Sequence, residues 1–134
     1  MEPTGAIVIV YRRGGRGIEY LVMHRGHAGP AYEGDWAWGP PSGAREPGET
    51  IDACARRELL EETGLRLDCT FACLDESGWP VYLAEAPADC AVCLSDEHDR
   101  FEWLPRAEAA GRTTPTVVRA QLLGAAARLE EPGG

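Results

Sequence analysis

Three glutamates in one short segment stand at a spacing that suits metal binding. Glu58, Glu61 and Glu62 occupy positions i, i+3 and i+4 of the run RRELLEETGL. In a helix these positions lie on one face, within about 100° of arc at 3.6 residues per turn. Like charges so placed cost roughly 0.2–0.5 kcal/mol per pair. A hard divalent cation, which prefers oxygen ligands, would offset that cost.

An alternative interpretation of the same residues needs no metal. Acidic helix faces are commonly solvated surfaces, and Arg57 is placed to pair with Glu61 four positions later. Under this interpretation the helix would carry only surface charge.

A helix must present this acidic face, and the flanking residues predict its limits. Thr50 is a good N-cap, Asp52 is favourable in the first turn, and Gly64 is the expected residue after the last turn. Apolar residues recur every four positions and should face a sheet. These residues are Ile51, Ala55 and Leu59. The predicted helix therefore has one stripe for packing beside an acidic stripe for ligands.

Apolar and β-branched runs predict the sheet against which this helix packs. The expected strands cover residues 5–11, 18–24, 36–38, 66–76, 79–85 and 101–104. Ser77 and Gly78 should form the turn of a hairpin between the fourth and fifth strands. Loops are expected over residues 25–35 and, as an acidic connection, over residues 86–100.

A final helix is expected to start at Thr114 or Thr116, near Pro115. Its apolar positions would be Val117, Val118, Leu122 and Leu123. Two helices and mixed strands indicate an α/β protein with a sheet layered between helices. With no internal repeat and no linker, residues 1–134 are expected to form one domain.

The segment GAREPGETIDACARRELLEETGL, from Gly43 to Leu65, resembles the signature of the Nudix hydrolase family. In that signature a glycine is followed after five residues by glutamate, and after seven more by R-E-aliphatic-x-E-E-x-G-aliphatic. Every fixed position is filled here, which favours the metal site over a merely solvated face. The resemblance implies a Nudix α/β/α sandwich with a mixed β-sheet between helices.

The resemblance also implies an activity and a cofactor. Nudix hydrolases cleave a pyrophosphate bond in a nucleoside diphosphate linked to another group, with Mg²⁺, or alternatively Mn²⁺, neutralising the phosphate oxygens. Glu61 and Glu62 match the main metal ligands, and the carbonyl of Gly43 often joins them. Glu58 matches either a ligand or the general base, and Arg57 would orient the carboxylates. The implied catalytic residues are therefore Arg57, Glu58 and Glu61, while Glu49 would link the loop to the helix.

Residues outside this segment resemble the diadenosine-tetraphosphate hydrolases of the same family. The run Ser95–His98 followed by Trp103 is similar to their S-x-E-H…W element, and residues 36–43 are similar to their W…PPKG entry. Glu97 would then be a further metal-binding or basic carboxylate. As an ordinary polar loop, the same run would have no such role.

One position departs from that pattern, because Ser42 stands where those enzymes carry lysine. A lysine there would contact phosphate as a point charge, so a replacement would have to come from Arg45, Arg25 or Arg100. The residues predicted to bind substrate are Arg45, Trp36 and Tyr82. The aromatic rings, with Trp79 as a further candidate, would stack on a base for roughly 1–3 kcal/mol each, or else belong to the core.

The composition and charge of the chain limit the kinds of molecule that it is expected to bind. A net charge of −9 argues against a nucleic-acid polymer, whereas a small phosphorylated nucleotide is compatible because bound cations invert the local field. No apolar run is long enough to cross a membrane, and the first residues do not read as a signal peptide. A cytoplasmic protein without a membrane partner is therefore expected, and a homodimer is left open.

Five cysteines, an odd number, favour reduced thiols. Cys69 and Cys73, with the C-x-x-C pair Cys90 and Cys93, leave structural zinc as a less favoured alternative, since the two pairs lack the usual spacing. His24 and His27, near the end of a predicted strand, are expected to be polar loop residues rather than ligands.

The leading function is thus a magnesium-dependent pyrophosphohydrolase. Dinucleoside polyphosphates and normal or oxidised nucleoside triphosphates are the favoured substrates, followed by nucleotide sugars and ADP-ribose. A second hypothesis is a non-catalytic Nudix module that binds a nucleotide as a sensor, which loss of the signature carboxylates would support; none is lost. A third is an isoprenyl-diphosphate isomerase, which would need a reactive cysteine such as Cys54, Cys69 or Cys73. RNA decapping is disfavoured by the acidic charge.

Overall fold

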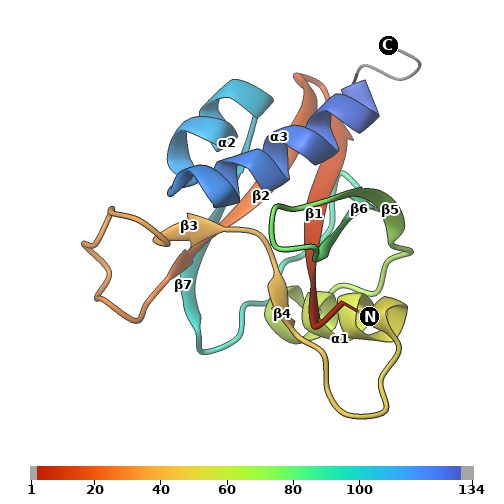
Figure 1. Ribbon diagram of the computed structural model, residues 1–134. Coiled ribbons are helices and arrows are strands. Elements are labelled where there is room, and N and C mark those ends of the chain that lie inside the picture. The colour runs from red at the N-terminus through yellow and green to blue at the C-terminus, as the bar shows by residue number, and fades with distance from the viewer. Residues whose placement is uncertain (1–2, 131–134) are drawn as a thin grey trace.

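The computed structural model describes residues 3–130 and contains one seven-stranded mixed sheet with helices on both faces (Figure 1). The strands are β1 (Gly5–Gly14), β2 (Gly17–Arg25), β3 (Trp38–Gly39), β4 (Ser42–Ala44), β5 (Thr70–Leu74), β6 (Pro80–Ala86) and β7 (His98–Leu104). The helices are α1 (Ile51–Thr63), α2 (Arg106–Arg112) and α3 (Thr116–Glu130). None of the helices in this part of the chain is long and apolar enough to cross a membrane.

Strand β1 is the centre of the sheet. It pairs antiparallel with β2 and β4 and parallel with β6. β2 also pairs with β3 and β7, and β6 pairs with β5. The pairing of β2 with β7 brings Arg25 opposite His98, two residues far apart in the sequence.

Alternation along β1 divides the interior into two cores, because successive side chains of a strand point to opposite faces. Ile7 and Ile9 pack in the core that contains Leu122 of α3, whereas Val8 packs in the core that contains Leu59 of α1. In Figure 1, α2 and α3 accordingly lie on one side of the sheet and α1 lies on the other. This is the α/β/α arrangement predicted from the sequence.

Both ends of α1 match their prediction. The Thr50 hydroxyl oxygen accepts the backbone N–H of Ala53 at 3.1 Å, which satisfies one of the unpaired donors of the first turn. Gly64 adopts the left-handed conformation, with φ of 74°, and its N–H donates to the carbonyl of Leu60 at 2.8 Å. The helix therefore starts and ends at residues with local reasons to do so.

Several predicted elements need correction. The expected strand over residues 66–76 is limited to β5, residues 3–130 contain three helices rather than two, and the short strand β4 was not expected. Helix α2 was missed because seven residues with only Ala109 and Ala110 buried carry little periodic signal. Its stability comes from packing against β2 and α3, which is a tertiary effect. Residues 98–100, predicted as part of a loop, begin β7.

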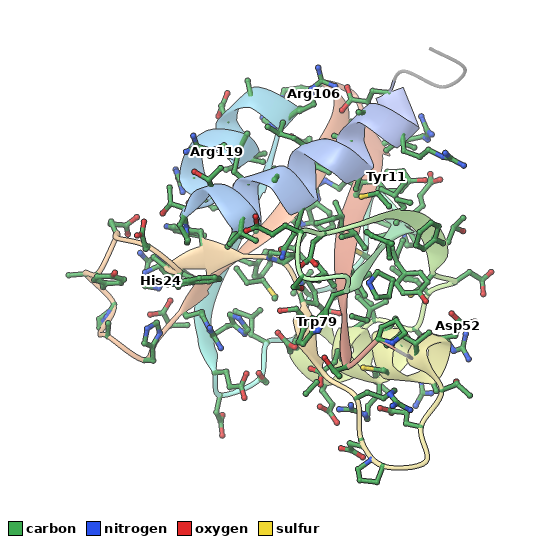
Figure 2. All side chains as sticks on the ribbon, viewed as in Figure 1. Tyr11, His24, Asp52, Trp79, Arg106 and Arg119 are labelled. Carbon is green, nitrogen blue, oxygen red and sulfur yellow. The ribbon has the colours of Figure 1, made fainter. Side chains whose placement is uncertain are left out.

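The prediction for His24 was wrong. The residue lies within β2 and is fully buried (Figure 2). Its Nδ1 is 2.8 Å from Asp99 Oδ1, and its Nε2 is 2.6 Å from the carbonyl oxygen of Tyr32. His24 thus connects β7 with the loop that precedes β3, while His27 lies exposed in that loop as predicted.

Thr50→Ala is expected to lower the free energy of unfolding by about 1 kcal/mol, because the Ala53 N–H loses its side-chain acceptor. Thr50→Ser keeps the hydroxyl and is expected to stay close to the parent protein. Urea denaturation of the three proteins measures the difference. Equal stabilities of Thr50→Ala and Thr50→Ser would contradict the capping role.

Candidate active site

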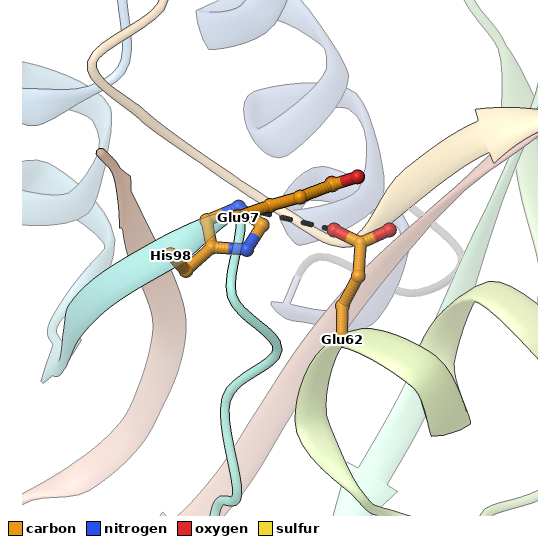
Figure 3. A group of neighbouring side chains, drawn as sticks. All are labelled: Glu62, Glu97 and His98. Carbon is orange, nitrogen blue, oxygen red and sulfur yellow. Dashed lines mark ion pairs between the residues drawn. The ribbon is translucent and has the colours of Figure 1, made fainter. Parts of the chain in front are cut away.

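Glu62, Glu97 and His98 gather at one point, although β5 and β6 lie between Glu62 and the other two in the sequence. Glu62 lies in the last turn of α1, His98 is the first residue of β7, and Glu97 directly precedes it (Figure 3). Each offers one ligand atom, and the three atoms all lie within 4.8 Å of one another. His98 Nε2 is 3.8 Å from Glu62 Oε1. Two carboxylates and an imidazole at this separation can share a divalent cation.

Glu62 is buried with little to neutralise it. Its side chain is 7% exposed, and the backbone N–H of Ser42 donates to its Oε2 at 3.3 Å. Burial, followed by the effect of neighbouring Glu58, raises the pKa of Glu62 to about 9. Without a cation this carboxyl group therefore holds a proton at neutral pH, and a bound cation would favour its ionised form.

His98 is also buried, and its Nδ1 has no hydrogen-bond partner among the described residues. Burial, with the charge of Arg25, lowers the pKa of His98 and favours the neutral imidazole, which is the form that binds metals. Buried polar atoms are rarely left unpaired in proteins. The neutral imidazole, whose Nε2 faces Glu62, and the raised pKa of Glu62 both fit a site that holds a cation.

Arg57 organises the carboxylates beside this group. Its guanidinium binds both carboxylate oxygens of Glu49, at 2.7 and 2.9 Å, and Glu58 Oε1 at 2.9 Å. Hydrogen bonds from Arg57 hold the pKa of Glu49 down to about 2. These contacts are the ones required by the roles predicted for Arg57, which orients carboxylates, and for Glu49, which links the loop to the helix.

Gly43 allows the Glu58 side chain to approach the strand. A Cβ atom at position 43 would overlap the carboxylate of Glu58, so any other residue there would push the end of that side chain aside. The Glu58 side chain is 12% exposed and lies close enough to Glu62 to raise its pKa. The glycine at the start of the signature is thus explained by a close contact with a glutamate fifteen residues later.

Glu61 is placed differently from Glu62. Its side chain is 55% exposed, and its carboxylate pairs with Arg57 Nη1 at 3.3 Å, as the alternative interpretation expected. Of the predicted metal ligands, Glu62 and Glu97 meet in the three-residue group, Glu58 adjoins Glu62, and Glu61 lies outside the group. His98 completes the group. His98 formed part of the S-x-E-H element in the sequence, but no role was predicted for it.

A cavity of about 320 Å³ opens beside these ligands. Its lining includes Glu62 and His98, together with the cationic Arg25 and the aromatic Trp36 and Trp79. Trp36 is 49% exposed and has φ of 69°, a conformation rare for a bulky residue. Strained residues of this kind concentrate at functional sites. The cavity has the size and the mixed polarity of small-molecule sites.

Two residues predicted to bind substrate lie elsewhere. Tyr82 is 4% exposed and donates to Asp52 at 2.7 Å within the core beneath α1, so its ring offers no face to a nucleotide. Arg45 donates to the carbonyl of Glu49 at 3.0 Å and does not line the cavity. Among the three arginines considered as replacements for the missing lysine, only Arg25 lines it.

The cysteines take no part in this site. All five are free, and none belongs to the one group within residues 3–130 that could hold a metal ion. Burial raises the pKa values of the Cys54, Cys69 and Cys73 thiols, which disfavours the reactive thiolate that an isomerase would need.

Comparison with known proteins finds one family model and several similar proteins. The family model of the NUDIX domain matches residues 1–123. The chain is 34% identical over 116 residues to an octanoyltransferase from Myxococcus xanthus, covering 75% of this chain and 30% of that protein. It is 29% identical over 107 residues to the NAD-capped RNA hydrolase ndx-9 from Caenorhabditis elegans, covering 72% of this chain and 27% of that protein. The chain thus spans less than a third of the length of these two relatives.

Among solved structures, a C. elegans Ap4A hydrolase binary complex superimposes with a TM-score of 0.75 and 25% sequence identity. The match covers 95% of this chain and 98% of that one. Near-complete coverage in both directions confirms the sandwich architecture predicted from the sequence.

In the absence of divalent cations, Glu62→Gln is expected to be more stable than the parent protein at pH 8, by at least about 1 kcal/mol. The raised pKa means that the folded state keeps a proton that the unfolded chain loses above pH about 4.5, so parent stability falls as the pH rises from there towards 9. Glutamine does not titrate. Denaturation in EDTA at pH 5 and pH 8 measures the free energy of unfolding of both proteins.

Glu61→Gln is the matched control, because the same change on an exposed side chain should leave the pH dependence of the parent intact. Adding Mg²⁺ or Mn²⁺ should stabilise the parent and not Glu62→Gln. An equal difference between parent and Glu62→Gln at both pH values would contradict the placement of Glu62.

Proposed function

The chain belongs to the NUDIX domain family, and we propose that it hydrolyses a pyrophosphate bond of a nucleotide with the help of a divalent cation. Membership confirms the family inferred from the segment Gly43 to Leu65. The observation that carries the proposal is the meeting of Glu62, Glu97 and His98, of which Glu62 and His98 line the 320 Å³ cavity. Ligands for a cation and space for a substrate thus adjoin.

The proposed cation is Mg²⁺, and the imidazole of His98 makes Mn²⁺ a good alternative. Its proposed ligands are Glu58, Glu62, Glu97 and His98, with Glu61 and the carbonyl oxygen of Gly43 as further candidates from the family signature. When bound, the cation would neutralise the phosphate oxygens and lower the pKa of a water molecule that it binds. Two of the carboxyl groups arrive on a rigid helix and one on the segment entering β7, so the site is assembled by tertiary contacts.

The remaining residues position the ligands and the substrate. Arg57 holds Glu58 and Glu49 by charge-assisted hydrogen bonds, which leaves Glu58 beside Glu62 as a ligand or general base. Arg25 makes no ion pair among the described residues and lines the cavity, where it is placed to bind a phosphate group. Trp36 and Trp79 offer aromatic surface for a base.

A dinucleoside polyphosphate or a nucleoside triphosphate is the proposed substrate class. Support comes from the likeness to an Ap4A hydrolase at 25% identity over nearly the whole chain, and from a cavity that combines aromatic rings with a cation. Retention of every signature carboxylate favours catalysis over a purely binding role. A single domain, a cytoplasmic location and, if the protein associates, a homodimer remain part of this proposal.

The proposal predicts magnesium-dependent cleavage of at least one substrate in a panel of diadenosine tetraphosphate, normal and oxidised nucleoside triphosphates, ADP-ribose and a nucleotide sugar. Products would be separated by anion exchange. Glu62→Gln should lower kcat by at least about 100-fold, because it removes a ligand held at the cavity wall. EDTA should abolish turnover, and Mn²⁺ should restore it.

Glu61→Gln provides the comparison for Glu62→Gln, since it is the same change one residue earlier on an exposed side chain. Its loss of kcat should be smaller than that of Glu62→Gln. Full activity of Glu62→Gln, or no cleavage of any substrate in the panel, would overturn the proposal.

Arg25→Ala should lower kcat/KM for the cleaved substrate by about 10-fold or more, because a charge-assisted contact with phosphate is worth about 1.5–3 kcal/mol. Arg25→Lys should recover part of the loss, since lysine keeps the charge without the planar fork. Arg45→Ala, which changes an arginine outside the cavity, is the control, with circular dichroism to check that it folds. Equal losses for Arg25→Ala and Arg45→Ala would argue against a phosphate contact by Arg25.

A further inference from the structure

Resting on the function proposed above, we infer that the cavity selects a nucleobase carrying an exocyclic amino group. The amino group would donate a hydrogen bond to the side-chain amide oxygen of Gln121. Gln121 lies on α3 and lines the same cavity as Trp36 and Trp79. Three features support this assignment. A tight turn immobilises Asp75, a hydrogen bond orients Gln121, and tryptophan side chains line the cavity where a base would stack.

Asp75 is fixed by the hairpin turn between β5 and β6. Its Oδ1 accepts hydrogen bonds from the backbone N–H and the hydroxyl of Ser77, at 2.9 and 2.6 Å, and from the backbone N–H of Trp79 at 3.0 Å. Burial opposes ionisation of Asp75, but these hydrogen bonds outweigh it and hold its pKa below the usual value. Asp75 is therefore an ionised group with a single orientation.

This carboxylate orients Gln121. Gln121 Nε2 donates to Asp75 Oδ2 at 3.0 Å. An ionised carboxylate only accepts hydrogen bonds, so the group facing it must be the amide nitrogen and cannot be the amide oxygen. Gln121 Oε1 is then left as an acceptor with no partner among the described residues. At this point the cavity wall thus presents Gln121 Oε1 as an acceptor beside the second hydrogen of Gln121 Nε2, while both oxygens of Asp75 already accept hydrogen bonds.

The aromatic lining belongs to the same cavity as Gln121. Trp79 follows the Asp75 turn directly, and its Nε1 donates to the hydroxyl of Thr4 at 2.8 Å (Figure 2). The backbone N–H of Trp36 donates to the carbonyl of Thr114 at 2.7 Å, which ties its loop to the start of α3. Base-stacking surface and a fixed acceptor are thus held by the same turn and the same helix.

The unpaired acceptor Gln121 Oε1 discriminates between bases. Adenine, guanine and cytosine each carry an amino group that can donate to Gln121 Oε1, whereas hypoxanthine and unsubstituted purine do not. A hydrogen atom in place of the amino group would leave Gln121 Oε1 unpaired. Loss of one such hydrogen bond is expected to lower kcat/KM about 10-fold.

The test compares nucleotides that differ only in an amino group: ATP against purine-riboside triphosphate, and GTP against ITP. With the unaltered protein, removing the amino group should lower kcat/KM about 10-fold in at least one pair, mainly through KM because the base is remote from the bond that breaks. Equal kcat/KM values within both pairs would overturn the inference without affecting the proposed hydrolysis.

Gln121→Leu keeps the approximate size and removes the amide. It should lower kcat/KM for the preferred amino-bearing nucleotide to the value for the nucleotide of the same pair that lacks the amino group. The kcat/KM for that second nucleotide should not change. Leu123→Ala, on an exposed residue of the same helix outside the cavity, is the control and should keep the preference. A preference that survives Gln121→Leu would overturn the role of Gln121. If Gln121→Leu does not fold, the comparison of nucleotides on the unaltered protein still decides.

Failure of hydrolysis would be distinguishable from failure of this inference. If no nucleotide is cleaved, binding of the same four nucleotides to the unaltered protein would be measured by quenching of tryptophan fluorescence. Tighter binding of an amino-bearing nucleotide, lost in Gln121→Leu, would support the inference while the proposed hydrolysis fails. Absence of binding by all four would overturn both.

Discussion

Burial of negative charge where α1 meets the start of β7 is the constraint on which the rest of the site depends. Glu62 is almost inaccessible to solvent and lies near Glu58 and Glu97, so its ionised form is strongly disfavoured when no cation is present. Water cannot relieve this repulsion, because the carboxyl group is enclosed. A divalent cation can, and its binding would release a proton from Glu62 near neutral pH.

The surrounding structure holds the acidic group together. Arg57 joins Glu49 and Glu58, so that one guanidinium compensates part of the charge and sets the direction of both side chains. Gly43 leaves the space that Glu58 fills, and Thr50 and Gly64 define the ends of the helix that carries the ligands. The apolar face of α1 packs on β1, which turns a local pattern of glutamates into a rigid arrangement.

The proposed recognition of the substrate depends on the opposite layer of the sandwich. Helix α3, the β5–β6 turn and the loop before β3 line the cavity, while α1 and β7 contribute the ligands at its wall. Gln121 and Asp75 connect the helix with the turn, and Trp36 contacts the segment before α3. Such a division lets the phosphate chemistry stay with the signature helix while the far wall of the cavity is free to select the base.

The sequence by itself determined the signature helix, its caps and the candidate carboxylates, because N-caps, left-handed glycines and i, i+3, i+4 spacing act within a few residues. It also predicted most strands, whose apolar alternation is local. Only the tertiary structure decided which of these groups meet. Pairing of β2 with β7 set His98 opposite Arg25, and packing of α1 against the sheet brought Glu62 to Glu97 and His98. The packing of the layers also buried Tyr82 and His24 and left the Glu61 side chain largely exposed. Burial and approach between residues distant in the chain depend on how the layers pack, which no short pattern encodes.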